Sequence, residues 1–459
     1  MLGQSTTRRL QANWIIRLFV VLALLEAGSS NLYAAITDNG NHPPPTTGPY
    51  GYGSFIPGSP GFPALGGTYV DPVFGETVRR ITDIGAKQNN EDIYGHHWAN
   101  ANGSYVFSRT INDTRILNPT TGAVVRSGVP CGSPCFEASW HPTNPDRYYY
   151  LNGSALVEYS VSAGTSTTIH TFAGTLQSMG GSLNWIDGTG DLFVVMIGGR
   201  ANLWKRSINL IYTNTVAPLG GGGGWVSISP DGNYLITAAG PTSEPHIEHY
   251  SYAINHTTHV VSPTPVNFWG LCGDHGAISS ASNGKTYFIT YDCNYSGNIW
   301  RADVSIDTSK MTAAQQQAAN LQLVPIGFTN GPDGHMSGGV IGAMKDWVFI
   351  DHEKIPDSFG NSVTGWLPYR SEIMAVNIIT GEVRRLAHHR SRVPGSSGAQ
   401  YYDQPRISCS WDGSLIIWTS NYNSAPVTGY SDLYGMGFHP GGGASDTTPP
   451  AAPVNLRIE

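Results

Sequence analysis

Six of the 15 histidines of this sequence, with three arginines, fall in a few short stretches, residues 94–97, 272–275, 333–335, 388–392 and 401–406. Imidazole can bind a metal ion, act as a general base or hydrogen-bond a hydroxyl group. Guanidinium groups pair with carboxylates. The stretches lie far apart in the chain, so they make one site only if the fold gathers them. Their spacing is specific to no particular metal.

A strand, an Asp-Gly or Asn-Gly turn and a second strand recur along the chain. In the clearest copy, residues 404–421, Asp412-Gly413 separates two strand-like runs. This dipeptide tolerates the positive φ angles of a hairpin turn. Degenerate copies repeat at roughly 40–50 residues, which is typical of a β-propeller. We expect seven blades, with innermost strands that begin near Trp98, Ala138, Ser182, Val226, Ala277, Val340 and Ile407.

The run 77–82 alternates like a strand, yet it precedes the first complete unit. The seventh unit has no outer strand of its own. We therefore expect the N-terminal run to supply that strand and close the ring, which removes an open sheet edge. The predicted fold is all-β, a seven-bladed β-propeller closed by an N-terminal outer strand. One surface helix is expected at residues 308–323.

In a propeller, the connections that lead into the innermost strands lie together on one face, at the mouth of the central channel. Four of these connections hold histidine, and the last adds Arg406. The sequence therefore predicts a mouth lined by histidine and arginine. In the structural alternative, each of these histidines only hydrogen-bonds its own blade. Asp187, Asp231 and Asp412 fall in turns at the opposite end and are expected to stabilise those turns.

The composition excludes some classes of function. The 459 residues carry a net charge of −7 with a pI of about 6.1, which argues against general nucleic-acid binding, because that needs a basic surface. The 56 glycines and 30 prolines, with 12% charged residues, favour short strands joined by turns. We expect a monomer that binds no nucleic acid.

The two ends of the chain differ from its middle. Residues 1–35 resemble an export signal peptide, with arginines before an apolar run that is too short to span a bilayer. A retained membrane anchor is the alternative. The expected organisation is a signal peptide at 1–35, a Pro/Gly-rich leader at 36–68, the propeller at 69–438 and a linker at 439–459. We expect a secreted or cell-surface protein, with the periplasm as the alternative, and no stable membrane insertion after signal cleavage.

Five cysteines in an exported chain favour disulfides. Cys131 and Cys135 are close enough in sequence for a local bridge. Cys272 and Cys293 flank a predicted hairpin almost symmetrically and are expected to meet across it. Cys409 lies inside a predicted strand and is expected to be a buried free thiol. The alternative is that all five are reduced.

Residues 71–83, 96–104 and 405–421 resemble secreted seven-bladed propellers with WD40-like, TolB-type repeats. Within that group the chain distantly resembles the oligogalacturonate lyase and ulvan lyase propellers, over roughly residues 69–438. These motifs are blade motifs, so they indicate the fold more directly than the reaction. The resemblance implies cleavage of uronate-containing polysaccharides by β-elimination, which needs a base for the C5 proton and a cation for the carboxylate.

The same resemblance implies roles for particular residues. A divalent metal ion would be held by His335, His388, His389 and Gln404, although the adjacent 388–389 pair departs from the separated histidines expected of such a site. The carboxylate would pair with Arg390 or Arg406. The base would be His97, His275 or Tyr402.

Two functions follow as hypotheses. The first is an exported propeller that acts on an acidic polysaccharide or oligosaccharide, by lyase chemistry. The second is a non-catalytic extracellular module that presents the same face to a glycan or a protein. The sequence separates them by one structural question, which is whether the mouth histidines converge on each other or each bond back to a blade.

Overall fold

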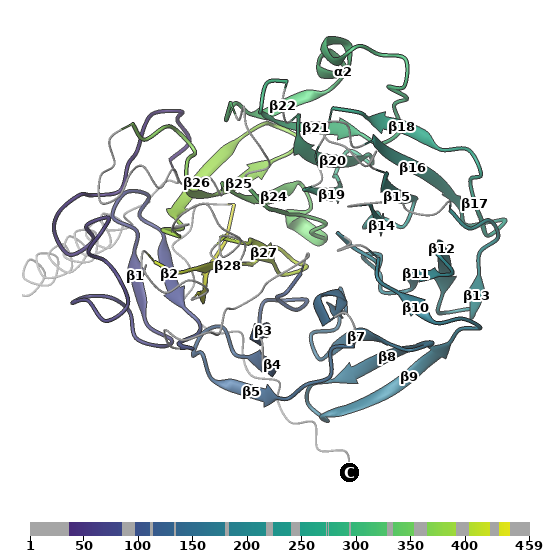
Figure 1. Ribbon diagram of the computed structural model, residues 1–459, viewed down its shortest axis with the longest axis horizontal. Coiled ribbons are helices and arrows are strands. Elements are labelled where there is room, and N and C mark those ends of the chain that lie inside the picture. Colours follow the sequence, from purple (N-terminus) through teal and green to yellow (C-terminus); the bar gives the residue numbers. More distant parts are fainter. Residues whose placement is uncertain are drawn as a thin grey trace, which may run out of the picture.

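The computed structural model describes residues 36–84, 97–110, 113–132, 135–179, 183–216, 224–239, 248–271, 273, 275–292, 295–327, 334–352, 365–391, 404–422 and 431–440. Strands in these residues form seven sheets arranged around a common centre (Figure 1). The prediction of an all-β, seven-bladed β-propeller is confirmed.

The first four blades follow one another along the chain. Blade 1 contains β3 (Val106–Thr110), β4 (Asp113–Leu117) and β5 (Val124–Ser127), with an isolated bridge from Ala99 to Val106 inside them. Blade 2 contains β6 (Ser139–Trp140), β7 (Arg147–Asn152), β8 (Ala155–Ser160) and β9 (Thr165–Thr171). Blade 3 contains β10 (Leu176–Gln177), β11 (Leu192–Ile197), β12 (Arg200–Lys205) and β13 (Leu210–Ile211). Blade 4 contains β14 (Trp225–Ile228), β15 (Tyr234–Ala239), β16 (Glu248–Asn255), β17 (Val260–Val261) and β18 (Val266–Trp269).

The remaining blades complete the ring. Blade 5 contains β19 (Gly276–Ser280), β20 (Thr286–Tyr291), β21 (Ile299–Asp303) and β22 (Leu321–Val324). Blade 6 contains β23 (Met336–Ser337), β24 (Trp347–Asp351), β25 (Glu372–Asn377) and β26 (Val383–His388). Blade 7 contains β27 (Ser408–Cys409), β28 (Leu415–Ser420) and β29 (Asp432–Gly437), followed on the outside by β2 (Thr77–Arg80) and β1 (Thr68–Val70).

The pairing of β2 with β29 closes the ring, as the sequence predicts. The register joins Arg79 to Gly435 and Arg80 to Tyr434. The buried Arg80 guanidinium also reaches the Asp432 carboxylate, with Nη2 2.7 Å from Oδ2. Closure therefore combines ladder hydrogen bonds with a charge-assisted contact that is shielded from water. The added strand β1 gives this blade five strands.

The turn carboxylates are structural, as expected. The buried Asp187 accepts hydrogen bonds from the backbone N–H groups of Asp191 and Leu192. Asp412 accepts hydrogen bonds from the hydroxyl group of Ser410 and the backbone N–H of Ser414. These contacts satisfy backbone donors in the tight connections between the first and second strands of the blades.

Two expected boundaries are wrong in detail. The innermost strand of blade 6 is β23, which precedes the expected start at Val340. The expected helix within 308–323 is the shorter α2 (Ala313–Ala319), because Leu321–Val324 pair with β21 as a strand. Thr312 and Gln315 form a capping box at the start of α2.

The segment that follows β23 lies across the central channel. The Ile341 N–H donates to the carbonyl of Trp411 in blade 7. A Cβ on Gly188 of blade 3 would lie 2.7 Å from the Ile341 side chain, and one on Gly339, where φ is +75°, would lie 2.3 Å from Asn184 Nδ2. Both positions therefore need glycine. Blades 3, 6 and 7 meet at this segment, on the side of the channel nearer the Asp-Gly turns.

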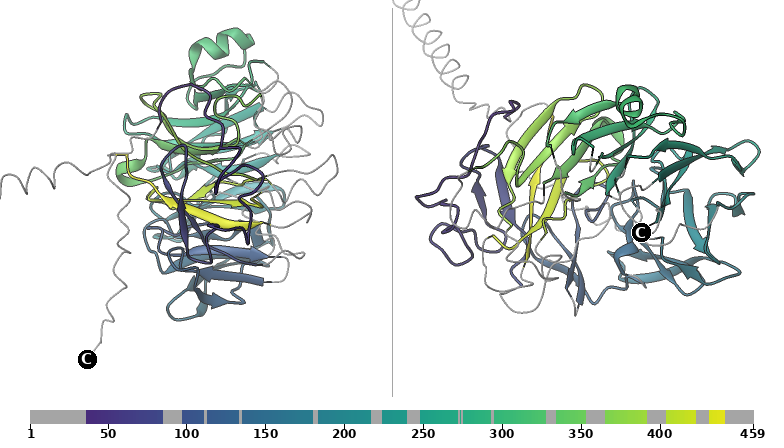
Figure 2. Two further views of the ribbon diagram at one scale, coloured as in Figure 1. Left: turned by 90° about the vertical axis from the view of Figure 1, so that its left-hand side faces the viewer. Right: turned by 45° about the horizontal axis from the view of Figure 1, so that its top comes forward.

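Residues 36–66, which the sequence analysis assigns to a leader, lie along blades 6 and 7 and are called the N-terminal strap below. Figures 1 and 2 show the strap, in purple, beside the green and yellow strands of these blades. Ile36 bridges to Arg385 in β26. Tyr52 and Phe55 are buried, and Phe55 packs against Tyr69 and Tyr422.

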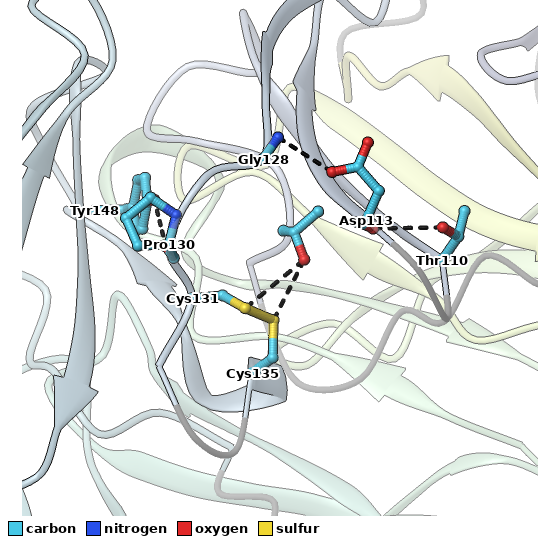
Figure 3. Close-up of a disulfide and its surroundings, with 8 residues drawn as sticks. Thr110, Asp113, Gly128, Pro130, Cys131, Cys135 and Tyr148 are labelled. Carbon is cyan, nitrogen blue, oxygen red and sulfur yellow. Dashed lines mark hydrogen bonds between the residues drawn. A yellow bond between two sulfur atoms is a disulfide. The ribbon is translucent and has the colours of Figure 1, made fainter.

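Cys131 and Cys135 form a disulfide, as predicted (Figure 3). Cys409 is a buried free thiol, also as predicted, and burial raises its pKa to about 12. Cys272 and Cys293 lie outside the described residues. In the parts of the chain listed at the start of this section, no helix has the length and apolar character needed to cross a membrane.

Candidate functional site at the channel mouth

Three histidines and one arginine occupy equivalent places, immediately before or at the start of an innermost segment. His97 precedes the inner segment of blade 1, His275 precedes β19, His335 precedes β23 and Arg406 precedes β27. We call these four residues the mouth positions. Innermost strands run in the same direction in every blade, so the mouth positions share one face of the ring.

His275 and His335 form a stacked pair. Their ring centroids are 4.6 Å apart and the rings are inclined by 23°. His275 Nδ1 lies 3.2 Å from the carbonyl oxygen of Gly334. A carbonyl only accepts, so Nδ1 carries a proton, and in the neutral ring Nε2 carries the lone pair. Nε2 makes no hydrogen bond within the described residues. Both side chains are half-buried, so the pair combines a fixed tautomer with access to solvent.

Asp351 holds the start of blade 6 against the start of blade 7. Its fully buried carboxylate accepts hydrogen bonds from the backbone N–H groups of His335 and Ile407, both at 2.8 Å. Burial raises the pKa of Asp351 well above its usual range, although these N–H groups and the charge of Arg406 oppose the shift. Oδ1 also lies 3.9 Å from His335 Nδ1. The carboxylate thereby fixes the position of His335 relative to Arg406.

His97 is buried between blades 1 and 7. Its Nδ1 lies 3.3 Å from the carbonyl of Cys409, and its ring stacks on Trp411 with centroids 3.8 Å apart. Its φ of 59° places it in the left-handed region, where a non-glycine residue is strained. This histidine bonds to the neighbouring blade 7 and contributes to the interface between blades.

His388, His389 and Arg390 follow one another at the end of β26, in a region that we call the blade 6–7 wall. His388 Nε2 donates to the carbonyl of His42 in the strap, and its backbone N–H donates to Asp71. His388 Nδ1 lies 3.6 Å from Asp71 Oδ2. Burial would raise the pKa of Asp71, but His388, Arg390 and a backbone N–H outweigh it and lower the pKa to about 2.

Both ring nitrogens of His389 are engaged. Nε2 donates to the carbonyl of His352 at 2.8 Å, and Nδ1 accepts from the N–H of Ser391 at 3.0 Å. The side chain is fully buried, and burial lowers its pKa to about 3. His389 is therefore a neutral structural histidine.

Arg390 is also enclosed in the wall. Its guanidinium donates to the carbonyl of Tyr50 at 3.0 Å and lies over the ring of Phe55, 5.2 Å from the centroid. The side chain is 1% exposed. Both partners belong to the N-terminal strap, so Arg390 attaches the strap to the propeller.

The structure does not bring the four predicted metal ligands into one site. His335 lies with His275 and Asp351, whereas His388 and His389 bond within the wall. The carbonyl of Gln404 accepts from the Thr419 hydroxyl. Within the residues that the structure describes, no three His, Cys, Asp or Glu side chains form a group able to hold a metal ion. Tyr402 lies outside the described residues.

Asp351 is the residue that sequence reasoning missed. The only signal is an acidic residue, followed by His352, at the end of the apolar run Trp347–Asp351. An acidic residue is common where an apolar run leads into a loop, so this signal does not indicate a functional site. Only the approach of His335 and Ile407 from two separate connections gives Asp351 its role.

No protein-family model and no curated protein matches the chain. Among solved structures, an oligogalacturonate lyase in complex with manganese aligns with a TM-score of 0.52 and 13% identity, over 82% of this chain and 96% of that chain. An oligogalacturonate lyase from Vibrio parahaemolyticus aligns with a TM-score of 0.48 and 10% identity, over 82% and 97%. TolB from Acinetobacter baumannii aligns with a TM-score of 0.35 and 13% identity, over 76% and 78%.

At such identities a structural likeness shows the fold alone. The distant resemblance to lyase propellers, inferred from the sequence, is confirmed at the level of the fold. The reaction and the ligand have to be argued from the residues of the mouth.

Proposed function

We propose that this propeller is an exported monomer that acts on an acidic, uronate-containing polysaccharide at the channel mouth, by β-elimination. The observation that carries the proposal is the His275–His335 pair, in which one imidazole has a fixed tautomer and an unbonded Nε2. A positioned imidazole of this kind is suited to general-base catalysis. The fold is compatible with this class of reaction, since an oligogalacturonate lyase shares it.

In the proposed reaction, His275 Nε2 accepts the C5 proton of a uronate residue. The electron pair of the C5–H bond forms a double bond to C4 as the C4–O bond breaks, and the leaving oxygen takes a proton from water. Negative charge develops on the carboxylate, so a nearby cation lowers the barrier. Arg406 is the favoured cation, since its charge acts on Asp351 beside His335. Arg390 is engaged by the strap, and Tyr402 remains a second candidate base.

A divalent metal ion is not part of this mechanism. The solved lyase is in complex with manganese. In this chain, His388 Nε2 and His389 Nε2 donate to backbone carbonyl groups, so these histidines do not suit a metal site with His335. We derive no step through a metal.

A second function is favoured by one observation. Arg406 and Arg390 are 3% and 1% exposed, so the two predicted partners for a substrate carboxylate are enclosed by protein. A mouth with accessible imidazoles and enclosed arginines suits a module that binds a glycan or a protein without cleaving it. A lyase releases unsaturated uronate products and a binding module does not, so an assay for these products separates the two functions.

The test is the ultraviolet absorbance of unsaturated uronate products on a panel of polyuronates. For a lyase, we expect His275→Ala to lower kcat by about 10²–10⁴-fold, because a general base contributes that much, and to leave the melting temperature unchanged. His335→Ala is expected to lower activity as well. The matched control is His256→Ala, since His256 follows β16 in a turn on the opposite face.

Absence of absorbance from the wild type on every polyuronate, together with retained polysaccharide binding, would contradict the lyase and support the module. Equal activity of the wild type and His275→Ala would remove His275 as the base.

A further inference from the structure

One exposed aromatic side chain lies on the same face as the mouth. Among the residues that the structure describes, Tyr295 is the only aromatic residue in the exposed class, at 44% exposure. Its hydroxyl makes no hydrogen bond within those residues. The other large exposed side chains are aliphatic and include pairs on outer strands, such as Val124 and Val125 on β5.

The sheet register places Tyr295 at the same end of blade 5 as His275. β19 and β20 pair Gly276 with Thr290, and β20 and β21 pair Tyr291 with Ile299. The connection between β20 and β21 therefore leaves the sheet at the end where His275 leads into β19. The Thr290 hydroxyl donates to the carbonyl of His275 at 2.7 Å. Tyr295 lies four residues beyond Tyr291, in that connection.

A buried carboxylate anchors the described part of this connection, residues 295–298. Asp292 is 0% exposed, and its backbone carbonyl accepts from the N–H of Tyr295 at 3.0 Å. The Asp292 side chain accepts four further hydrogen bonds, from Ser296 Oγ, Asn298 N, Trp300 Nε1 and Gln317 Nε2. Such a network fixes the described residues 295–298 before any ligand arrives, so their part in binding costs little conformational entropy.

The chemistry around Tyr295 suits a sugar ring. The flat face of a phenol packs against the C–H groups of a pyranose, while polar neighbours bond its hydroxyl groups. The half-buried Ser296 follows Tyr295, and its hydroxyl group, which donates to Asp292, can still accept a hydrogen bond from a sugar. A protein-binding surface needs a contiguous apolar patch, and a single aromatic residue among polar neighbours does not provide one. A rigid, isolated tyrosine is therefore a better platform for a sugar than for a protein.

We propose that Tyr295 is a stacking platform that binds one pyranose ring of the polysaccharide beside the His275–His335 pair. The nature of this ligand rests on the proposed function. Tyr295 binds and positions the chain, and the reaction itself takes place at His275. The tyrosine thereby sets how the polysaccharide runs across the mouth.

The test measures binding separately from cleavage. Native gels that contain polygalacturonate, alginate, ulvan or glucuronan retard a protein that binds them. We expect wild-type retardation on at least one gel, about tenfold weaker affinity for Tyr295→Ala, and nearly full affinity for Tyr295→Phe, which keeps the ring. Ile208→Ala, at a 51% exposed position on blade 3, is the matched control and is expected to bind like the wild type. Melting curves establish that the variants fold.

The outcomes separate this inference from the proposed function. Binding that depends on Tyr295, without unsaturated products, rejects the lyase and retains the platform. Cleavage by the wild type with equal affinity and KM for Tyr295→Ala retains the lyase and overturns the platform. No retardation of the wild type on any of the four gels also overturns it, as does a loss of affinity in Tyr295→Phe equal to that in Tyr295→Ala.

Discussion

The His275–His335 pair, called the mouth pair below, and the blade 6–7 wall both contain histidine side chains, and they differ in what surrounds those side chains. His275 and His335 are half-buried, and His275 keeps an unbonded nitrogen. His388, His389 and Arg390 are fully buried, and the strap or the blade itself provides their partners. Basic residues at a blade connection are therefore equally suited to chemistry and to assembly, and the neighbouring segments decide between the two.

The N-terminal strap makes the difference. Its carbonyl groups accept from Arg385, His388 and Arg390, and its Phe55 lies beneath the Arg390 guanidinium. Backbone carbonyls of a segment without regular strands need donors when they are buried, and the wall supplies them. Among the described residues, no segment provides a hydrogen-bond partner for His275 Nε2.

The largest expected effect on stability is at Arg385, which lies in β26 just before the blade 6–7 wall. Arg385 pairs with Glu372 through two contacts of 2.6 and 2.5 Å, and both side chains are buried. Arg385→Ala leaves the Glu372 carboxylate buried without its partner, and we expect the free energy of unfolding to fall by about 3–5 kcal/mol. Denaturant unfolding measures the change.

The neighbouring residue provides the control for Arg385. Arg384 pairs with the half-exposed Glu382, and Arg384→Ala is expected to cost less than about 1 kcal/mol. If the two variants lost similar amounts of unfolding free energy, the buried Arg385–Glu372 pair would not stabilise the fold more than a half-exposed pair does.

A smaller effect is expected from pH. Burial holds the pKa of His389 near 3 in the folded protein, below its ordinary value of 6.5. The unfolded chain therefore takes up a proton first as the pH falls. The stabilising contribution of neutral His389 is complete above pH 6.5 and is lost as the pH falls from 6.5 towards 3. Linkage gives a loss of about 2 kcal/mol between pH 7 and pH 5.

Unfolding in denaturant at several pH values, for the wild type and His389→Gln, measures this term. Glutamine can keep the bond to the His352 carbonyl but does not titrate. We expect the variant to have a shallower dependence on pH below 6.5. Identical slopes would mean that His389 is not the neutral, enclosed group described above, and the contrast with the mouth pair would weaken.

The smallest effect is expected at the disulfide. Cys131 and Cys135 are separated by four positions, and so short a loop restricts the unfolded chain only weakly. The double variant Cys131→Ser/Cys135→Ser is expected to lose no more than about 2 kcal/mol. Thermal unfolding checks this value. A loss as large as that of Arg385→Ala would show that the blade 1–2 connection, not the wall, is the main support of the ring.

Much of the architecture could be predicted, because it depends on local patterns. The turn at Asp412-Gly413 and its copies identify blades through hairpin geometry, and the unpaired run at Thr77–Arg80 identifies the closing strand. The inner strand of blade 6 was misplaced, because the glycines and apolar residues of 338–344 resemble a strand while they in fact lie across the channel.

The candidate site was predicted only in part. His275 and His335 lie together, and Arg406 acts on Asp351 beside them. The grouping of His335 with His388 and His389 was suggested by residue type, but the three do not form a metal-binding group among the described residues. Residue type limits which contacts a side chain can make, but the fold decides which partner lies next to it.

The sequence by itself determined the ring and its closure, since strand alternation and turn chemistry act over a few neighbouring residues. Only the tertiary structure decided which basic residues the N-terminal strap encloses and which remain open. That choice depends on the contact of segments more than three hundred residues apart, such as His42 with His388 and Tyr50 with Arg390. Burial and hydrogen-bond partners across such distances set whether an imidazole or a guanidinium supports the fold or meets a ligand.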